Sequence, residues 1–231
     1  MANRKQAAKA AAEAARKEAQ TKKERFNKII GVIAVLLVAG AALCFVLGGS
    51  GTNTSGRPEG DYLTGKHYVQ IDVQDYGVIT AELDADAAPI TVTNFVKLAN
   101  EGFYDGLTFH RIISGFMIQG GDPKGNGTGG SDEEIWGEFA VNGWNNPIAH
   151  ERGVLSMARS QMPNSASSQF FIMHQAAPHL DGSYAAFGHV LTGMEVVDAI
   201  CANTPVTDYN GTVQKANQPV ITSIKVIEKP E

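Results

Sequence analysis

FHRIISGFMIQGGD, residues 109–122, is the most informative stretch of this chain. It contains two short apolar runs with Ser114 and Gly115 between them. Short apolar runs bounded by turn residues favour β-strands, which we expect over residues 108–112 and 116–119. Arg111 stands inside the first run, where it could form a structural ion pair or act as a functional cation.

Further strand candidates extend along residues 66–229. The segment 67–73 (HYVQIDV) alternates apolar and polar residues, and 76–83 (YGVITAEL) follows after a short break, so a hairpin is expected. Helical spacing of apolar residues predicts only two helices, one that begins near Pro89 and stops at Gly102, and one over 194–201. The other strand candidates lie at 153–158, 169–173, 186–190 and 220–227. Many short strands with two helices favour a closed or sandwich β-architecture over alternating βαβ units.

The formal net charge of −5 divides unequally along the 231 residues. Residues 1–28 hold nine basic and three acidic side chains, a net charge of +6. The remaining 203 residues hold ten basic and 21 acidic side chains, a net charge of −11. A nucleic-acid binder needs a basic face, so the acidic main part of the chain argues against nucleic acid as a partner.

Residues 29–47 (IIGVIAVLLVAGAALCFVL) form an uncharged apolar run of 19 residues. As a helix this run is about 28 Å long, which matches the hydrocarbon thickness of a bilayer and predicts a transmembrane helix. The basic segment before it places the N-terminus in the cytoplasm and the rest outside, in a single-pass protein of the cell membrane. A cleaved signal peptide is the alternative, but its apolar region is usually shorter. Lipoprotein signals place a small residue just before the lipidated cysteine, whereas Cys44 follows Leu43, so a lipoprotein signal is poorly supported.

The membrane segment divides the chain into four parts. Residues 1–28 favour a helix, and could lie along anionic lipid headgroups or remain a partly disordered tail that sets the topology. Residues 48–65 are rich in Gly, Ser and Thr and are expected to be a flexible linker. Residues 66–229 then form one domain, which is long enough to bury a core without disulfides.

Several other kinds of site find little support in the sequence. The segment 125–130 (GNGTGG) fits G-x-G-x-x-G, but the acids of the following SDEE would repel phosphate, so we expect a surface loop and no nucleotide. The six histidines show neither H-E-x-x-H nor H-x-H spacing, and we expect neither a metal nor another cofactor. Ser156 and the other serines lack a G-x-S-x-G motif, and Cys201 lacks a basic setting, so no covalent nucleophile is predicted.

The domain resembles the cyclophilin family of peptidyl-prolyl cis-trans isomerases. The blocks that carry the resemblance are FHRII-x-GFM-x-QGGD (109–122), GVLSMA (153–158), SQFFI (168–172), HLDG (179–182) and AFG (186–188). They occur in the family's order and cover the domain but none of the segments before it. The resemblance implies a closed, eight-stranded antiparallel β-barrel capped by two helices, with a substrate groove on its outer wall.

The resemblance also implies which residues form the site. Arg111 matches the family's principal catalytic arginine, and Gln119 and Gln169 match residues that orient the substrate and the arginine. The backbone near Ala158, Arg159 and Ser160 matches the part that binds an extended peptide. The positions that match the proline pocket and its rim are Phe116, Met117, Phe171, His179, Leu180 and Tyr184.

This chain departs from the family pattern at the rim of the groove. His179 stands where many eukaryotic members have a tryptophan that helps to bind cyclosporin, so we expect weak cyclosporin binding. Tyr184 stands where such members have a histidine. Arg159 replaces a common asparagine, and one residue is inserted in the stretch after it, which leaves the preference for the residue before proline open.

The resemblance predicts an isomerase that rotates X-Pro bonds of unfolded or secreted polypeptides outside the cytoplasm. Arg111 would stabilise the twisted amide without covalent chemistry. A proline-peptide binding module or chaperone with little isomerase activity is the alternative. A short basic tail followed by one anchor is typical of a membrane-anchored bacterial form, and we expect a monomer.

Overall fold

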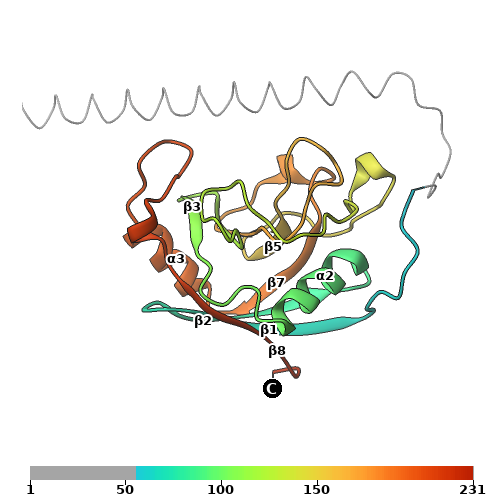
Figure 1. Ribbon diagram of the computed structural model, residues 1–231, viewed down its shortest axis with the longest axis horizontal. Coiled ribbons are helices and arrows are strands. Elements are labelled where there is room, and N and C mark those ends of the chain that lie inside the picture. Colours follow the sequence, from blue (N-terminus) through green and yellow to red (C-terminus); the bar gives the residue numbers. More distant parts are fainter. Residues whose placement is uncertain (1–55, 231) are drawn as a thin grey trace, which may run out of the picture. The chain divides into compact units, whose positions relative to one another are not determined.

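One sheet of eight strands dominates the computed structural model, which describes residues 56–230 (Figure 1). In space the strands run in the order β3-β4-β6-β5-β7-β2-β1-β8, and every neighbouring pair is antiparallel. The strands are β1 (Lys66–Val73), β2 (Gly77–Asp84), β3 (Phe109–Ile113), β4 (Met117–Gly120), β5 (Val154–Met157), β6 (Phe170–Met173), β7 (Ala186–Thr192) and β8 (Ile221–Ile227). The mainly β, antiparallel architecture expected from the sequence is confirmed.

The edge strands β3 and β8 meet at one end only. An isolated bridge joins Thr108 to Val220, which lie just before the two strands. Further along, the edge of β3 pairs with residues 211–213, where the Ile112 N–H donates to the Gly211 carbonyl at 2.8 Å. The sheet is therefore a curled half-barrel. The prediction of a closed barrel is thus confirmed only as far as a curled, eight-stranded antiparallel sheet, whose edges are joined at one end by backbone hydrogen bonds such as that from the Ile221 N–H to the Leu107 carbonyl at 2.7 Å.

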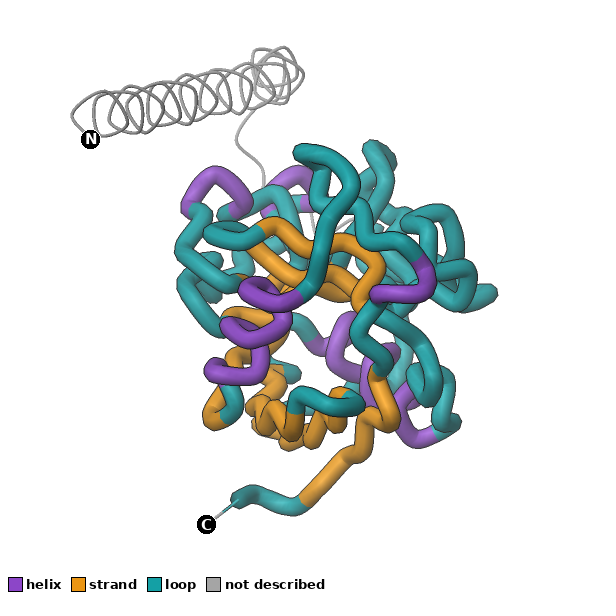
Figure 2. The backbone as a smooth tube through the Cα atoms, turned by 90° about the vertical axis from the view of Figure 1, so that its left-hand side faces the viewer, coloured by secondary structure: helices purple, strands orange, loops and turns teal. Residues whose placement is uncertain are grey.

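Helices α2 (Pro89–Asn100) and α3 (Met194–Asn203) are the two helices that the sequence predicted. Their ends, and those of the eight strands, lie within two residues of the expected positions. Helix α2 packs against β8 and β2, and α3 contacts β2, β3 and β4. Three short 3-10 turns were not expected: η1 (Ala140–Asn142), η2 (Pro178–Leu180) and η3 (Lys215–Asn217). Figure 2 shows that loops connect most of these elements and cover much of the sheet.

The main core lies inside the curl of the sheet. The alternating residues of the β1–β2 hairpin point into it, and Val69, Ile71 and Leu83 have no exposed surface. Phe95 of α2 packs against the rings of Tyr104, Phe170 and Phe187, with ring centroids 5.0–5.3 Å away. Such aromatic contacts add specific geometry to the burial of apolar area.

Strands β4 and β6 are buried on both faces. The cross-strand partners Ile118 and Ile172 belong to the main core, whereas their chain neighbours Met117 and Phe171 point to the opposite face, as the period of two requires. There they join a second set of apolar side chains, which we call the outer apolar cluster. Its buried members are Met117, Val154, Phe171, Met173, Ala177, Leu180 and Ala186, with Phe116, Ala158 and Tyr184 partly buried against them.

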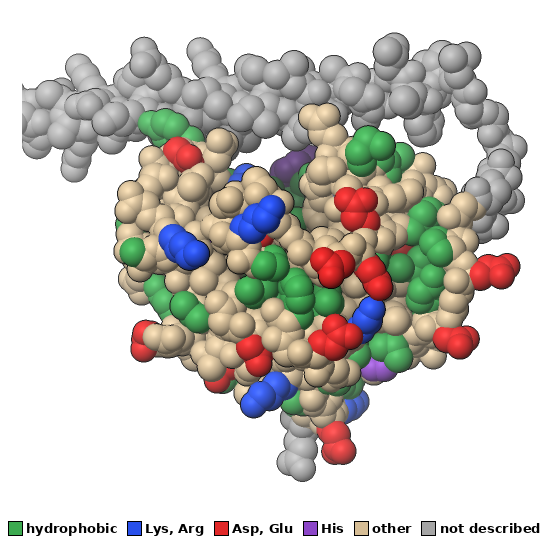
Figure 3. Space-filling view, in the orientation of Figure 1, with side chains coloured by type: hydrophobic (Ala, Val, Ile, Leu, Met, Phe, Trp, Pro, Cys, Tyr) green, Lys and Arg blue, Asp and Glu red, His purple; other side chains and the backbone are tan. Residues whose placement is uncertain are grey.

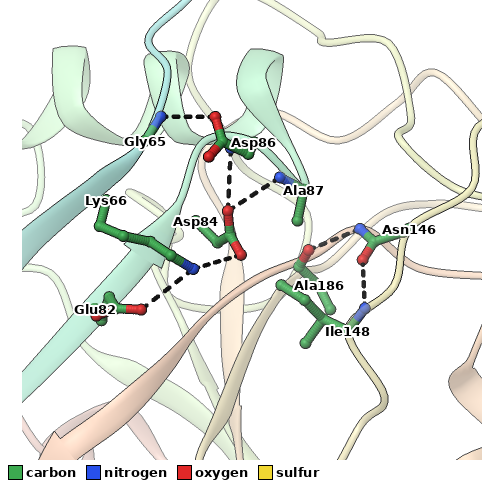
Figure 4. Close-up of polar contacts among 9 residues, drawn as sticks. All are labelled: Gly65, Lys66, Glu82, Asp84, Asp86, Ala87, Asn146, Ile148 and Ala186. Atoms are coloured by element: carbon green, nitrogen blue, oxygen red, sulfur yellow. Dashed lines mark hydrogen bonds and ion pairs between the residues drawn. The ribbon is translucent and has the colours of Figure 1, made fainter.

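Residues 56–65, the last part of the predicted linker, make defined contacts with the domain. The guanidinium carbon of Arg57 lies 5.3 Å from the ring centroid of Tyr62 and 4.9 Å from that of Trp144. The Leu63 N–H donates to the Thr93 side-chain oxygen at 2.8 Å. The Gly65 N–H donates to Asp86 at 2.8 Å, beside the ion pair of Lys66 with Asp84 (Figure 4). Residues 48–55 lie outside the described part of the chain.

The predicted basic segment 1–28 and membrane helix 29–47 also lie outside the described residues. Among the helices of residues 56–230, none is long and apolar enough to cross a membrane. On the face seen in Figure 3, acidic side chains are spread between small, separate hydrophobic patches. This distribution agrees with the net negative charge of the sequence after residue 28.

The N-terminus of α2 is capped by a residue from another part of the chain. The capping position, Ala88, has no polar side chain, and the buried carboxylate of Glu138 accepts hydrogen bonds from the N–H groups of Ile90 at 2.9 Å and Thr91 at 2.8 Å. Burial raises the pKa of the Glu138 carboxyl, while the two N–H donors favour its ionised form. Glu138 thus ties the segment before η1 to the first turn of α2.

Replacing Glu138 by alanine should lower the free energy of unfolding by about 3 kcal/mol, because two buried N–H groups lose a charged acceptor. Urea denaturation can be followed by the fluorescence of Trp136 and Trp144, whose ring centroids lie 6.2 Å apart and of which Trp144 donates to the Ala87 carbonyl just before α2. As a control, Glu82→Ala removes a more exposed partner of Lys66 and should cost less than about 1 kcal/mol. Equal losses in the two variants would contradict the capping role.

Candidate active site

Three neighbouring strands bring Arg111, Gln119 and Phe171 into one row. Arg111 of β3 is the cross-strand partner of Gln119 on β4, and Gln119 is the partner of Phe171 on β6. Directly opposed residues of antiparallel strands have their Cβ atoms about 5 Å apart. The sheet register alone therefore places a cation, an amide and an aromatic ring side by side on the outer wall.

A chain of hydrogen bonds fixes the polar side of this row. Arg111 donates from Nη1 to Gln119 Oε1 at 3.2 Å, and Gln119 donates from Nε2 to Gln169 Oε1 at 2.9 Å. Gln169 in turn donates from Nε2 to the Gly129 carbonyl at 2.7 Å. Each amide has its acceptor and its donor defined by its neighbours. The predicted surface loop 125–130 is confirmed as a loop, and it anchors the far end of this chain.

Arg111 is held at two of its three nitrogens. Nε donates to the Asn210 carbonyl at 2.8 Å. Nη1 donates to Gln119 Oε1 at 3.2 Å and also lies 4.0 Å from the sulfur of Met117. No hydrogen bond to a described residue uses Nη2. Burial lowers the pKa of the guanidinium, although an arginine in this setting remains charged at neutral pH. A fixed cation with a spare donor thus stands at the edge of the outer apolar cluster.

Aromatic contacts organise the outer apolar cluster next to Arg111. The Phe171 and Tyr184 rings meet edge to face with centroids 5.9 Å apart, and Phe116 stacks on His179 at 5.8 Å. Leu180, from η2, is buried in the same cluster. Five of the apolar or aromatic positions predicted for the proline pocket are thus members of this cluster, and His179 lies against one of them.

A buried hydrogen-bonded group stabilises Phe171 from behind. His150 stacks on the Phe171 ring at 6.1 Å, and its two ring nitrogens lie 2.9 Å from Asp181 Oδ1 and 2.9 Å from Ser156 Oγ. Burial lowers the pKa of His150, so the ring is neutral at neutral pH. Burial would raise the pKa of Asp181, but hydrogen bonds from His150 lower it overall.

The Ser156–His150–Asp181 arrangement has the connectivity of a hydrolase triad but no access to substrate. Ser156 is 0% exposed and His150 1% exposed, so neither can meet a peptide at the surface. Cys201 is also a poor nucleophile, since burial raises the pKa of its thiol to about 11. Among residues 56–230, no group of three or more His, Cys, Asp or Glu side chains could hold a metal ion.

The segment 158–160 presents free backbone groups beside the cluster. The Ala158 N–H donates to the Gln169 carbonyl at 2.9 Å and the Ser160 N–H to Ser165 Oγ at 3.0 Å. Between them, the N–H and carbonyl of Arg159 take part in no hydrogen bond with a described residue. Such an unpaired backbone edge can receive an extended peptide.

The side chain of Arg159 joins three segments around the cluster. Its guanidinium carbon lies 4.9 Å from the ring centroid of Phe139 and 4.7 Å from that of Tyr184. Nε and Nη2 donate to the Ser183 carbonyl at 3.1 and 2.8 Å, and Nη1 donates to the Ser160 carbonyl at 2.9 Å. The substitution of arginine at this position therefore fixes Tyr184 and the loop after residue 159 in place.

The structure brings the predicted site residues together on one side of the sheet, and it adds residues that the sequence reasoning missed. These are His150 and Asp181 behind Phe171, Phe139 beneath Arg159, and Asn210 at Arg111. The composition of the segment DYNG (208–211) predicts a turn, since Asp, Asn and Gly favour turns. Nothing in the sequence indicates that this turn meets Arg111.

Comparison with known proteins agrees with the fold and the site. The family described as cyclophilin type peptidyl-prolyl cis-trans isomerase/CLD matches residues 68–226. Peptidyl-prolyl cis-trans isomerase B of Bacillus subtilis is 52% identical over 123 residues, which are 53% of this chain and 82% of that protein. Peptidyl-prolyl cis-trans isomerase CYP18-1 of Arabidopsis thaliana is 49% identical over 123 residues, 53% of this chain and 75% of that protein.

A solved structure gives the same result. The crystal structure of a cyclophilin type isomerase of Cryptosporidium parvum has a TM-score of 0.63 and 31% identity, and covers 72% of this chain and 100% of that one. A structure of that protein in the presence of the dipeptide Ala-Pro has a TM-score of 0.62 and 33% identity, and covers 70% of this chain and 99% of that one. The half-barrel fold and the family match agree on one class of protein, the prolyl isomerases. The chain belongs to the cyclophilin-type peptidyl-prolyl cis-trans isomerases, and it is an enzyme of this activity.

Replacing Arg159 by alanine should raise KM about fivefold and leave kcat nearly unchanged. The lost contacts with two rings are worth about 1 kcal/mol, and they order the binding surface in the ground state and the transition state alike. Arg159→Lys keeps the charge but cannot form the planar fork, so it should resemble the alanine variant. The kinetics of a proline peptide measure both constants. An unchanged KM in the alanine variant would contradict the role given to Arg159.

Proposed function

We propose that this isomerase accelerates rotation about X-Pro bonds through binding and electrostatics alone, with Arg111 as its central catalytic residue. The barrier to rotation is about 18–20 kcal/mol, because resonance gives the C–N bond partial double-bond character. A catalyst has to bind the twisted amide, in which the nitrogen lone pair is no longer delocalised, more tightly than the planar forms. The observation that carries this proposal is the row of Arg111, Gln119 and Phe171 across β3, β4 and β6.

In this proposal the proline ring lies on the outer apolar cluster. Phe116, Met117, Phe171 and Leu180 supply the apolar surface, and Tyr184 borders it. Burial of the ring contributes about 0.8 kcal/mol of binding free energy per methylene group removed from water. The bound ring then holds one side of the C–N bond fixed. The acyl half of the substrate can then turn against a stationary ring.

Arg111 meets the part of the substrate whose charge changes during rotation. With Nε and Nη1 already bonded, Nη2 is the donor available to the substrate carbonyl or to the prolyl nitrogen. The nitrogen accepts a hydrogen bond well only when its lone pair is localised, so this contact is strongest in the twisted state. Gln119 holds the guanidinium through Nη1, and Gln169 in turn holds Gln119 by accepting its N–H.

The residues before proline are proposed to bind as an extended strand. The free N–H and carbonyl of Arg159 offer one pair of main-chain hydrogen bonds, between the paired groups of Ala158 and Ser160. Main-chain pairing of this kind gives affinity without strict dependence on side chains. It suits an enzyme whose substrates are many different unfolded polypeptides.

We also propose that this is a membrane-anchored bacterial form that assists the folding of secreted or envelope proteins. The support is the apolar run 29–47, the +6 charge before it and the acidic domain after it. Uncatalysed X-Pro isomerisation takes tens of seconds, which makes a helper useful where proteins fold after export. Weak cyclosporin binding, from His179 in place of a tryptophan, and a monomeric state stay predictions.

Replacing Arg111 by alanine should lower kcat by about a hundredfold or more, since it removes the donor that acts on the twisted amide. Arg111→Lys should recover little, because a single ammonium cannot keep the contacts to Asn210 and Gln119 and still reach the substrate. The full chain can be assayed in detergent by protease-coupled hydrolysis or by NMR exchange of an X-Pro peptide. A thermal midpoint close to that of the unmutated chain shows that the variant is folded.

Two other outcomes of this assay would change the proposal. If Arg111→Ala kept the full rate, catalysis would depend on the apolar cluster alone. If the unmutated chain bound proline peptides but gave no rate above background, it would be a binding module.

A protease added to intact cells should digest residues 66–229, because the positive-inside rule places this domain outside. A tag at the N-terminus should survive until the cells are lysed, as it lies in the cytoplasm. Immunoblots against both ends measure the two results. Protection of the domain in intact cells would contradict the proposed topology.

A further inference from the structure

Arg111 depends on a turn that lies almost a hundred residues away in the chain. Its Nε donates to the backbone carbonyl of Asn210 at 2.8 Å, across a sequence separation of 99 residues. Arg111 is also bridged to Thr212 by backbone pairing. The turn 207–212 therefore covers the free edge of β3 where the catalytic guanidinium leaves the strand.

The carboxylate of Asp208 builds this turn. Asp208 Oδ1 accepts hydrogen bonds from the N–H groups of Asn210 at 2.9 Å and of Thr212 at 3.1 Å. The pKa of the Asp208 carboxyl lies below its usual value because the N–H groups of the turn, first that of Thr212, stabilise its ionised form. The Thr207 N–H closes the turn by donating to the Thr212 carbonyl at 2.8 Å. The Asp208 carboxylate thus bonds the N–H groups of the residues on both sides of Gly211, next to the Asn210 carbonyl that Arg111 uses.

Glycine at position 211 lets the turn come close to β3. Gly211 has a φ of 79°, which few other residues adopt, and its N–H donates to the Asp208 carbonyl at 3.2 Å. A Cβ atom there would collide with the backbone of Ile112. Its own carbonyl accepts from the Ile112 N–H at 2.8 Å. The turn is therefore seated against the strand at the residue that follows Arg111.

We propose that Asp208 is a positioning residue for the isomerase reaction, and that it acts by holding the Asn210 carbonyl where it aims the guanidinium of Arg111. An arginine side chain has several rotatable bonds and loses about 2 kcal/mol of rotamer entropy when it is fixed. The Nε contact to Asn210 and the Nη1 contact to Gln119 engage two different nitrogens of the guanidinium. Together these two contacts set the direction of Nη2. Gln119 belongs to the sheet, whereas Asn210 belongs to the turn that Asp208 holds.

This inference rests on the proposed catalytic role of Arg111, and it explains how the Arg111 side chain is oriented. Asp208 does not touch the apolar cluster or the free backbone of Arg159, so it has no direct part in substrate binding among the described contacts. Loss of the turn should therefore leave the substrate bound but the donor misplaced. The expected signature is a lower kcat with a nearly unchanged KM.

The test compares Asp208→Ala with Asp208→Asn in the full chain. The alanine variant should lose about tenfold in kcat, less than the hundredfold that a 1 Å misplacement can cost, because the Asn210 carbonyl is still present but no longer fixed. The asparagine variant should keep kcat within about twofold, because its side-chain oxygen can accept the same two N–H groups. KM should change little in either variant.

Asp84→Ala is a matched control. Asp84 Oδ1 also accepts two turn N–H groups, those of Asp86 and Ala87 at 3.1 Å each, at the end of β2 (Figure 4). This variant loses the same kind of turn, and an ion pair with Lys66, and should keep its kcat. If all three variants lost activity in proportion to their thermal stability, the effect would be structural and the inference would fail.

The remaining outcomes separate this inference from the proposed function. If Asp208→Asn lost as much kcat as Asp208→Ala, the charge of Asp208 and not the turn would act on Arg111, and the inference would be overturned. If Asp208→Ala kept its kcat while Arg111→Ala lost activity, the inference would fail and the role of Arg111 would stand. A full rate in Arg111→Ala would remove the proposed catalytic role itself, and Asp208 would then have nothing to position.

Discussion

The two-sided burial of β4 and β6 is the constraint on which the rest of this molecule depends. Each strand has only four residues, and successive side chains alternate between the main core and the outer apolar cluster. A slip of one residue in β4 would exchange these faces, sending Gln119 into the core and Ile118 into the site. The composition of the row of Arg111, Gln119 and Phe171 is therefore a consequence of sheet register, and the register is fixed because both faces must bury apolar side chains.

Rotation about an amide bond needs no proton transfer and no nucleophile, so the site needs neither an acid–base pair nor a covalent catalyst. In the proposed mechanism the protein supplies orientation, with hydrogen bonds at Nε and Nη1 of Arg111 that leave Nη2 without a partner among the described residues. The arrangement of Ser156, His150 and Asp181 illustrates the opposite case. Its connectivity resembles that of a hydrolase, yet the burial of Ser156 and His150 behind Phe171 gives it a packing role. A Ser–His–Asp arrangement needs exposure to substrate before it can act as a hydrolase, and the buried Ser156 and His150 lack it.

Arginines occupy two quite different roles around the outer apolar cluster. Arg111 is fixed by polar acceptors, so its charge remains available, whereas Arg159 lies between the rings of Phe139 and Tyr184 and has carbonyl acceptors at each of its nitrogens. The first arrangement suits a group that acts on substrate, and the second suits one that holds the rim. The rim of this isomerase is thus set by a side chain that departs from the family pattern.

Local pattern determined much of this protein. Alternation in 67–73 and 76–83 predicted the hairpin, helical spacing predicted α2 and α3, and the FHRII and SQFFI blocks indicated the family and which residues to expect in its site. Tertiary structure alone decided that residues 211–213 pair with the edge of β3, and that Glu138 caps α2. It also decided that the Asn210 carbonyl meets Arg111. These contacts join residues far apart in the chain through backbone groups, and a backbone N–H or carbonyl is the same at every position, so no residue type in the sequence records them.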